Sequence, residues 1–162
     1  MATILKFTRV ISSINTETLN LNDGVNYSLG EGWQPNVSRL KSSNLSGEIY
    51  DPVEENIPIR VSGNTASDFY DALFTLYDFL EHADNWRNGG FVNPVILHYR
   101  PINSILTNPV QVMVLGSVGN ESPMSLTPEF NETVQAFEAV VTVSIMRKGQ
   151  WLGDEETEDS GS

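Results

Sequence analysis

The sequence contains no cysteine and only two histidines among its 162 residues. The absence of cysteine excludes disulfides, zinc–thiolate sites, iron–sulfur ligation and cysteine nucleophiles. Apolar runs are short, and none approaches the roughly 18 residues that a membrane-spanning helix needs. The N-terminal segment MATILKFTRV lacks a basic stretch followed by an apolar one, so it predicts no secretory signal. We therefore expect a globular protein that is synthesised in the cytoplasm.

Positive charge is also scarce. Nine Lys and Arg residues oppose 21 Asp and Glu residues, which gives a formal net charge of −12. A surface this acidic repels phosphate backbones and anionic lipids, so we expect neither nucleic acid nor a membrane as a direct partner. The acidity is typical of a charged, soluble surface, and a negative lining that prevents DNA from sticking is the alternative.

Candidate chemistry is equally limited. His82 falls near the end of a predicted helix and His98 in a predicted strand, and one sequence cannot show that they converge on a metal. Asp78 and Glu81 lie three residues apart on the same helix, a spacing more typical of a solvated face than of a hydrolase pair. No metalloprotease, nucleophile-elbow or phosphate-loop motif is present. We expect no metal, no cofactor and no enzymatic activity.

The clearest structural signal is the alternation in TVQAFEAVVTVSIMR, residues 133–147. Alternate side chains of a strand face opposite sides of a sheet, so this pattern predicts one long, half-buried strand. The apolar side contains Phe137, Ala139, Val141, Val143 and Ile145, and most of the polar residues are Gln135, Glu138, Thr142 and Ser144.

One amphipathic helix is predicted at about residues 65–87. Its apolar residues recur at three- and four-residue spacing, which places them on one face. Thr65 and Asp68 resemble a capping box, and Asn88-Gly89-Gly90 predicts the end of the helix. We also expect Trp86 to continue the apolar stripe into the core.

The other elements follow from alternation and turn residues. Asp23-Gly24 predicts a tight turn between two strands of a hairpin. The remaining expectations are a strand at 4–14, hairpin strands at 19–21 and 25–29, a long loop at 30–56 with a short strand at 45–50, strands at 57–61, 92–99 and 110–115, loops at 103–108 and 116–131, and a disordered acidic tail at 153–162.

This order of elements predicts a single β-rich domain over residues 1–152. The fold class is α+β and mainly β: an antiparallel sandwich or barrel-like sheet with one amphipathic helix packed against it. Among the tryptophans, we expect Trp33 in the long loop to be exposed and Trp151 to cover the end of the sheet.

Four segments stand out in order along the chain: LNDGVNYSLGEGWQP, VSGNTASDFYDALFTLYDFLEHADNW, NPVILHYRP and VVTVSIMRKGQWLG. Together they resemble virion proteins of tailed bacteriophages and prophages, in particular tail-tube-like and distal-tail proteins. The resemblance covers about residues 17–152. The loop at 30–56 departs from it, because a simple tube subunit would show plain two-strand spacing there.

The resemblance implies a virion protein, made in the bacterial host cytoplasm, that self-assembles into rings, commonly hexameric. Its partners would be further copies of itself and adjacent virion proteins. Neighbouring subunits would continue one sheet, with free strand edges at 133–147 and 110–115 as the interface. The candidate interface residues are Trp33, Val110, Val112, Gln135, Thr142 and Ser144.

Two other functions stay open from the sequence. A capsid decoration or cement protein would share the virion setting but occupy the head. A carbohydrate-binding module would require an exposed platform of aromatic side chains, for which the three tryptophans are the candidates.

Overall fold

The computed structural model describes residues 3–30, 32–36, 52–101, 108–118, 124–127, 137–149 and 151–152. The described residues form one helix and eight strands. In chain order these are β1 (Ile4–Ser12), β2 (Asn15–Asn20), β3 (Tyr27–Leu29), β4 (Val53–Gly63), α1 (Ala66–Arg87), β5 (Val95–Arg100), β6 (Val110–Ser117), β7 (Met124–Thr127) and β8 (Phe137–Arg147).

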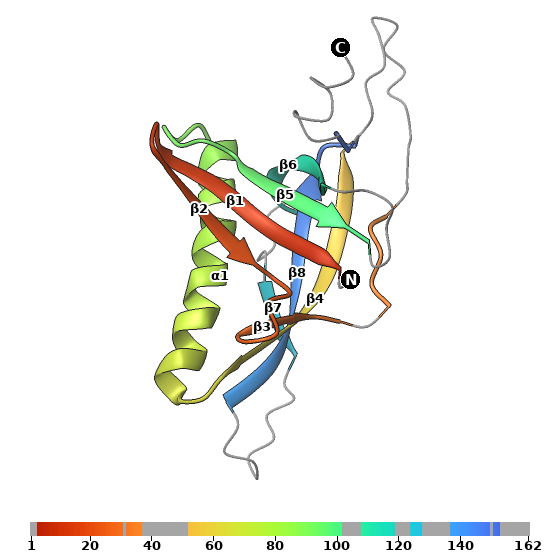
Figure 1. Ribbon diagram of the computed structural model, residues 1–162. Helices are drawn as coiled ribbons and strands as arrows, with labels where there is room; N and C mark the ends of the chain where they lie inside the picture. Colours follow the sequence, from red (N-terminus) through yellow and green to blue (C-terminus); the bar gives the residue numbers. More distant parts are fainter. Residues whose placement is uncertain are drawn as a thin grey trace, which may run out of the picture.

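All eight strands belong to one antiparallel sheet. Seven strands follow the order β2-β1-β5-β6-β8-β4-β3, and β7 pairs with β8 on the side that β6 also uses. The sheet curls until it nearly closes into a barrel, with α1 packed along it (Figure 1). The predicted fold class, mainly β and barrel-like with one helix, is confirmed.

The helix forms where its apolar periodicity and caps predicted it. Thr65 has an extended backbone, and its hydroxyl oxygen accepts the Asp68 N–H at 3.1 Å, which satisfies one unpaired donor of the first turn. After α1 the chain turns at Gly89, whose φ of 90° is disfavoured for residues with a side chain. Trp86 is only half-buried and lies outside the core cluster, so its predicted core position is wrong.

The core lies between α1 and the inner face of the sheet. It contains alternate residues of β4 from Ile57 to Val61 and of β8 from Ala139 to Ile145, together with the apolar stripe of the helix. The rings of Phe7 and Phe79 stack at 6.5 Å between β1 and α1. The predicted inward side of β8 is confirmed from Ala139 to Ile145, whereas Phe137 at the strand end is exposed.

The N-terminal hairpin differs from the prediction. The chain reverses after Ser12, so that β1 pairs with β2, and no hairpin joins β2 to β3. Gly24 does adopt a turn conformation, with φ of 75°, and the Asp23 carboxylate accepts three following backbone N–H groups. The turn was therefore predicted correctly but its strands were paired wrongly, because turn residues do not specify which strands become neighbours.

Two strands extend into segments predicted as loops. β4 begins at Val53, four residues before the predicted start at Ile57. The prediction was too short because the charged residue Glu55 occupies an inward position and interrupts the apolar alternation there. β7 lies within the predicted loop at 116–131, between Pro123 and Pro128. The predicted short strand at 45–50, residues 133–136 of the long strand, residues 103–107 of the predicted loop at 103–108 and the acidic tail lie outside the described residues.

Candidate interaction surfaces

The terminal strand β8 has neighbours on both edges. Along one edge it pairs with β4 over its whole length, from Phe137 to Arg147. Along the other edge it pairs with β7 at residues 140–143 and with β6 at residues 145–147. β6 is likewise flanked by β5 and β8. The prediction that these two strands offer free edges for assembly is therefore wrong for the described residues.

The predicted interface residues on these strands are dispersed. Thr142 and Ser144 lie on the outer face of β8, half-buried, and the Ser144 hydroxyl donates to the Asn56 side-chain oxygen at 2.8 Å. Val110 is half-buried at the start of β6, whereas Val112 is only 3% exposed and belongs to the core. Gln135 lies outside the described residues.

Trp33 covers the outer edge of β4 and does not project from the molecule. Its indole N–H donates to the Asn56 carbonyl at 3.0 Å, and its ring packs on the core. Two residues after Asn56, the Pro58 carbonyl accepts the Gly30 N–H at 2.8 Å. Two residues before Asn56, the Glu54 carbonyl accepts the Asn36 side-chain amide. Three successive edge carbonyls of β4 are thus already paired, which prevents strand addition there.

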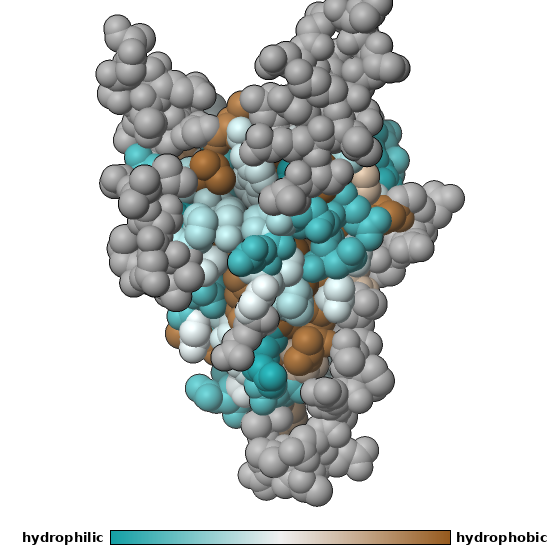
Figure 2. All heavy atoms as spheres, turned by 90° about the vertical axis from the view of Figure 1, so that its right-hand side faces the viewer, coloured by the Kyte–Doolittle hydropathy of each residue, from teal (hydrophilic) through white to brown (hydrophobic). Residues whose placement is uncertain are grey.

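Pro58 contributes to the same protection. Its carbonyl points to the edge, so its nitrogen points there too, and a proline nitrogen carries no hydrogen to offer a new strand. On the side of the molecule that carries β4, the described surface is mostly hydrophilic, with smaller hydrophobic patches (Figure 2). The expected exposed position of Trp33 is wrong, because its side chain is half-buried and packs against the core.

A buried ion pair holds this edge segment in place. Arg147 Nε and Glu55 Oε2 are 2.7 Å apart, and both side chains are 1% exposed. The Glu55 carboxylate accepts the Asn36 N–H, and the Arg147 guanidinium donates to the Asn36 carbonyl at 2.7 Å. These bonds satisfy both charges inside the protein, as buried ions require.

Aromatic rings close the same end of the sheet. The Arg147 guanidinium lies 4.7 Å from the centroid of the Trp151 ring, a cation–π contact. Tyr99 lies between Trp151 and Trp33, with ring centroids 5.9 and 5.7 Å away. The predicted place of Trp151 at the sheet end is confirmed. Because these rings pack on each other and on the core, they do not form an exposed sugar platform.

The free edge at one end of the sheet is β2. Within the described residues it pairs only with β1, and it carries neither proline nor lysine, two residues that commonly block edges. β1 pairs with β5 only as far as Arg9, so the hairpin beyond Arg9 projects past β5.

The end of this hairpin is apolar. Val10, Ile11 and Ile14, here called the hairpin tip, are all exposed, Ile14 to 96%. Phe91, in the segment between α1 and β5, is also fully exposed. This segment lies beside the hairpin tip, because the Asn93 side-chain amide donates to the Val10 carbonyl at 3.3 Å (upper left in Figure 1). Isolated exposed apolar residues are common, but four at one projecting end indicate a contact surface.

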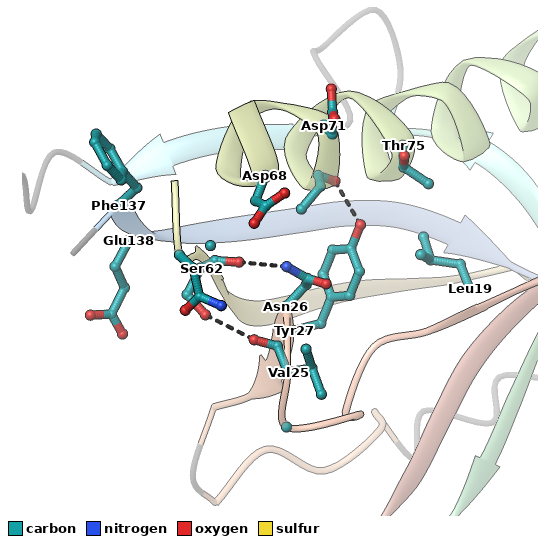
Figure 3. A pocket seen from close by; sticks show the side chains of 14 residues that line it. Leu19, Val25, Asn26, Tyr27, Ser62, Asp68, Asp71, Thr75, Phe137 and Glu138 are labelled. Atoms are coloured by element: carbon teal, nitrogen blue, oxygen red, sulfur yellow. Dashed lines mark hydrogen bonds between the residues drawn. The ribbon is translucent and has the colours of Figure 1, made fainter. Parts of the chain in front are cut away.

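At the opposite end of the sheet, β3 is short and tethered. The Tyr27 hydroxyl donates to the Ala72 carbonyl of α1 at 2.7 Å, and the Asn26 side chain donates to the Ser62 carbonyl at 2.9 Å (Figure 3). Burial, reinforced by the negative charge of Asp23, raises the pKa of Tyr27 to about 12. The phenol is therefore protonated at neutral pH and acts as a fixed donor.

An open cleft of about 870 Å³ lies between this region, the first turns of α1 and the start of β8. Asp68, Asp71 and Glu138 supply its negative charge, and Val25 and Phe137 are exposed at its rim (Figure 3). Its lining residues include no histidine, lysine or cysteine. The cleft is thus an acidic groove with an apolar rim.

The histidines and acids singled out from the sequence are held in separate contacts. His82 Nε2 is 2.8 Å from the Asn93 carbonyl, and His98 Nε2 is 2.8 Å from the Thr8 hydroxyl. Asp78 accepts from Arg9 at 2.8 Å, while Glu81 lies on the outer side of α1. In the part of the chain that is described, no three acidic, histidine or cysteine side chains form a group suited to a metal ion.

None of the described helices has both the length and the apolar character required to cross a membrane. No protein-family model and no curated protein matches this sequence.

Proposed function

We propose that this protein is a non-enzymatic structural subunit of a tailed-phage or prophage virion, a tail component of the tube, distal tail or baseplate-adjacent type. It would assemble into homo-oligomeric rings, with a hexamer as the form that the sequence resemblance implies, and would contact adjacent virion proteins. The observation that carries the proposal is the β2 edge, which no described strand pairs, beside the projecting hairpin tip.

The β2 edge has the chemistry that strand addition uses. An unpaired edge exposes a row of N–H and C=O groups that can hydrogen-bond to a strand of another copy. The uncharged tip beside it can bury its apolar side chains at the same time, which adds a hydrophobic contribution to the backbone hydrogen bonds. The assembly strand of this proposal is thus β2 and not β8.

The type of contact determines the type of assembly. Pairing of β2 with β2 of a second copy would be isologous and would stop at a dimer, whereas pairing with a different edge would be heterologous and could close into a ring. Because the chain is strongly acidic and the tip is uncharged, added salt should strengthen assembly by screening the repulsion between copies.

The direct test is sedimentation velocity with negative-stain microscopy on the full chain and on two matched variants. Thr18→Lys places a charge on the exposed part of β2, and Thr142→Lys makes the same change on the outer face of β8. We expect Thr18→Lys to weaken assembly about tenfold or more and Thr142→Lys to leave it within about twofold.

A second pair tests the hairpin tip. Ile14→Lys should weaken assembly, whereas Val25→Lys, which alters another exposed apolar residue, should not. A stable monomer at all concentrations would contradict the proposal. Dimers or trimers that bind empty capsids would favour a decoration protein, and a monomer that binds glycans would favour a carbohydrate-binding module.

A further inference from the structure

The outer face of α1 carries a line of exposed aromatic side chains. Tyr70, Phe74 and Tyr77, here called the aromatic ridge, follow one another at spacings of four and three residues, so they share one face of the helix. Phe74 is 67% exposed, and the rings of Tyr70 and Phe74 stack with centroids 6.4 Å apart. The opposite face of the same helix is already buried in the core.

The ridge is unusual for a solvent-exposed helix face. Large aromatic residues are poorer helix formers than Lys, Glu or Gln, which commonly occupy such faces. Each ring also leaves a large apolar area in water that a partner could bury. Three such rings in a row therefore indicate a surface selected for contact and not for helix stability alone.

Carboxylates flank the ridge. Asp71, Asp78 and Glu81 line a shallow hollow of about 620 Å³ together with Phe74 and Tyr77. Arg9 pairs with Asp78, but none of the salt bridges among the described residues engages Asp71 or Glu81. The nearby charge of Glu81, followed by its hydrogen bond, raises the pKa of Tyr77 above its usual value, which reflects the negative potential there.

We propose that the aromatic ridge docks a cationic, amphipathic segment of another protein, with its apolar side chains on the rings and its Lys or Arg side chains on Asp71 and Glu81. Aromatic faces and carboxylates both attract such cations, and aromatic rings also provide the hydrophobic area. A second copy of this chain is the poorer occupant, because an acidic chain with a net charge of −12 offers little positive charge to the carboxylates beside the ridge. The ridge would thus bind a different component from the one that β2 pairs with.

The probe for this proposal is a fluorescently labelled amphipathic helical peptide of leucine and lysine, and its control is the same peptide with glutamate at every lysine position. Anisotropy titrations with the full chain should show binding of the lysine peptide only. Added salt should weaken this binding, because it screens charge attraction. Salt thus acts here in the opposite direction from its expected effect on ring assembly.

Matched variants locate the binding surface. Phe74→Ser and the double variant Asp71→Asn/Glu81→Gln should each weaken peptide binding by about tenfold. Val25→Ser and Glu54→Gln/Glu138→Gln make comparable changes away from the ridge and should alter binding by less than about twofold. Circular dichroism on every variant ensures that only folded proteins are compared.

Three results would overturn the inference. They are equal binding of the two peptides, equal binding by ridge and control variants, and a loss of self-assembly in Phe74→Ser, which would assign the ridge to a second copy. The two proposals can fail separately, because Thr18→Lys should leave peptide binding intact and the ridge variants should leave ring formation intact.

Discussion

The C-terminal strand β8 and the N-terminal β1–β2 hairpin use their backbone groups in opposite ways. β8 is the longer and more regular element, yet β4 occupies one of its edges and β6 and β7 share the other. The two hairpin strands are shorter than β8, β2 is mostly exposed, and β2 pairs on one edge only among the described residues. The strand with the strongest pattern is thus internal, whereas the weakly patterned one has an edge that no described strand occupies.

This contrast separates two properties of a strand. Alternation reports which face of the strand is buried, because side chains point up and down from the sheet. Edge pairing lies in the plane of the sheet and leaves no mark on the alternation. A long amphipathic strand therefore predicts a large buried face but does not predict a free edge.

The largest expected effect comes from breaking the ion pair at the end of β8. Glu55→Gln leaves the buried Arg147 without its counter-charge, so the free energy of unfolding should fall by about 3–5 kcal/mol. Urea denaturation measures the loss. Glu54→Gln, which changes the exposed neighbour, should alter stability by about 0.5 kcal/mol or less.

The same site offers a rescue. A double variant, Glu55→Leu with Arg147→Met, removes both charges and should recover most of the stability lost in Glu55→Gln. If Glu55→Gln and Glu54→Gln are equally stable, the pair does not hold β8 and the edge segment together.

Trp33→Ala should convert the covered edge of β4 into one that resembles β2. Loss of the half-buried ring and of its bond to Asn56 should lower the free energy of unfolding by about 2–3 kcal/mol. The freed carbonyl should also increase self-association in sedimentation experiments. Trp86→Ala, at a half-buried tryptophan away from any strand edge, is the control and should not increase association.

Tyr27→Phe tests the tether that distinguishes β3 from β2. Loss of the hydrogen bond to Ala72 should lower the free energy of unfolding by about 1 kcal/mol at neutral pH. Tyr70→Phe, on the exposed ridge, should change it little.

The raised pKa of Tyr27 also predicts a pH dependence. The folded state holds the phenolic proton more tightly than the unfolded state, whose pKa is near 10, so this stabilisation is complete below pH 10. It should be lost as the pH rises from 10 to about 12, and Tyr27→Phe should lack this decline. Identical alkaline unfolding profiles for the two proteins would contradict the assignment.

The smallest expected effect lies on the outer face of β8. Ser144→Ala removes one exposed hydrogen bond to Asn56 and should change stability by about 0.5 kcal/mol or less, with no effect on assembly. Its inward neighbour Val143 is fully buried, so Val143→Ala should cost about 2 kcal/mol. Weaker assembly of Ser144→Ala would contradict the proposal that β2, and not β8, forms the interface.

Much of the local structure could be predicted from residue order. The bounds of α1, the cap at Thr65, the turn at Gly24 and the inward side of β8 all depend on spacing or on conformational preference within a few residues. The aromatic ridge could also have been found, since its spacing matches the helix period. The core-facing stripe alone does not reveal it, because the ridge lies on the opposite face of the helix.

Strand neighbours, and therefore free edges, were decided only by the tertiary structure. Glu55 and Arg147 are far apart in the chain and reveal their pairing only when β4 and β8 lie side by side. The sequence places Trp33 in a loop and predicts it to be exposed, whereas in the folded protein its indole N–H donates to the Asn56 carbonyl of β4. Side-chain patterns constrain the faces of each strand, whereas the partners of its backbone groups depend on contacts between distant segments, which no local pattern encodes.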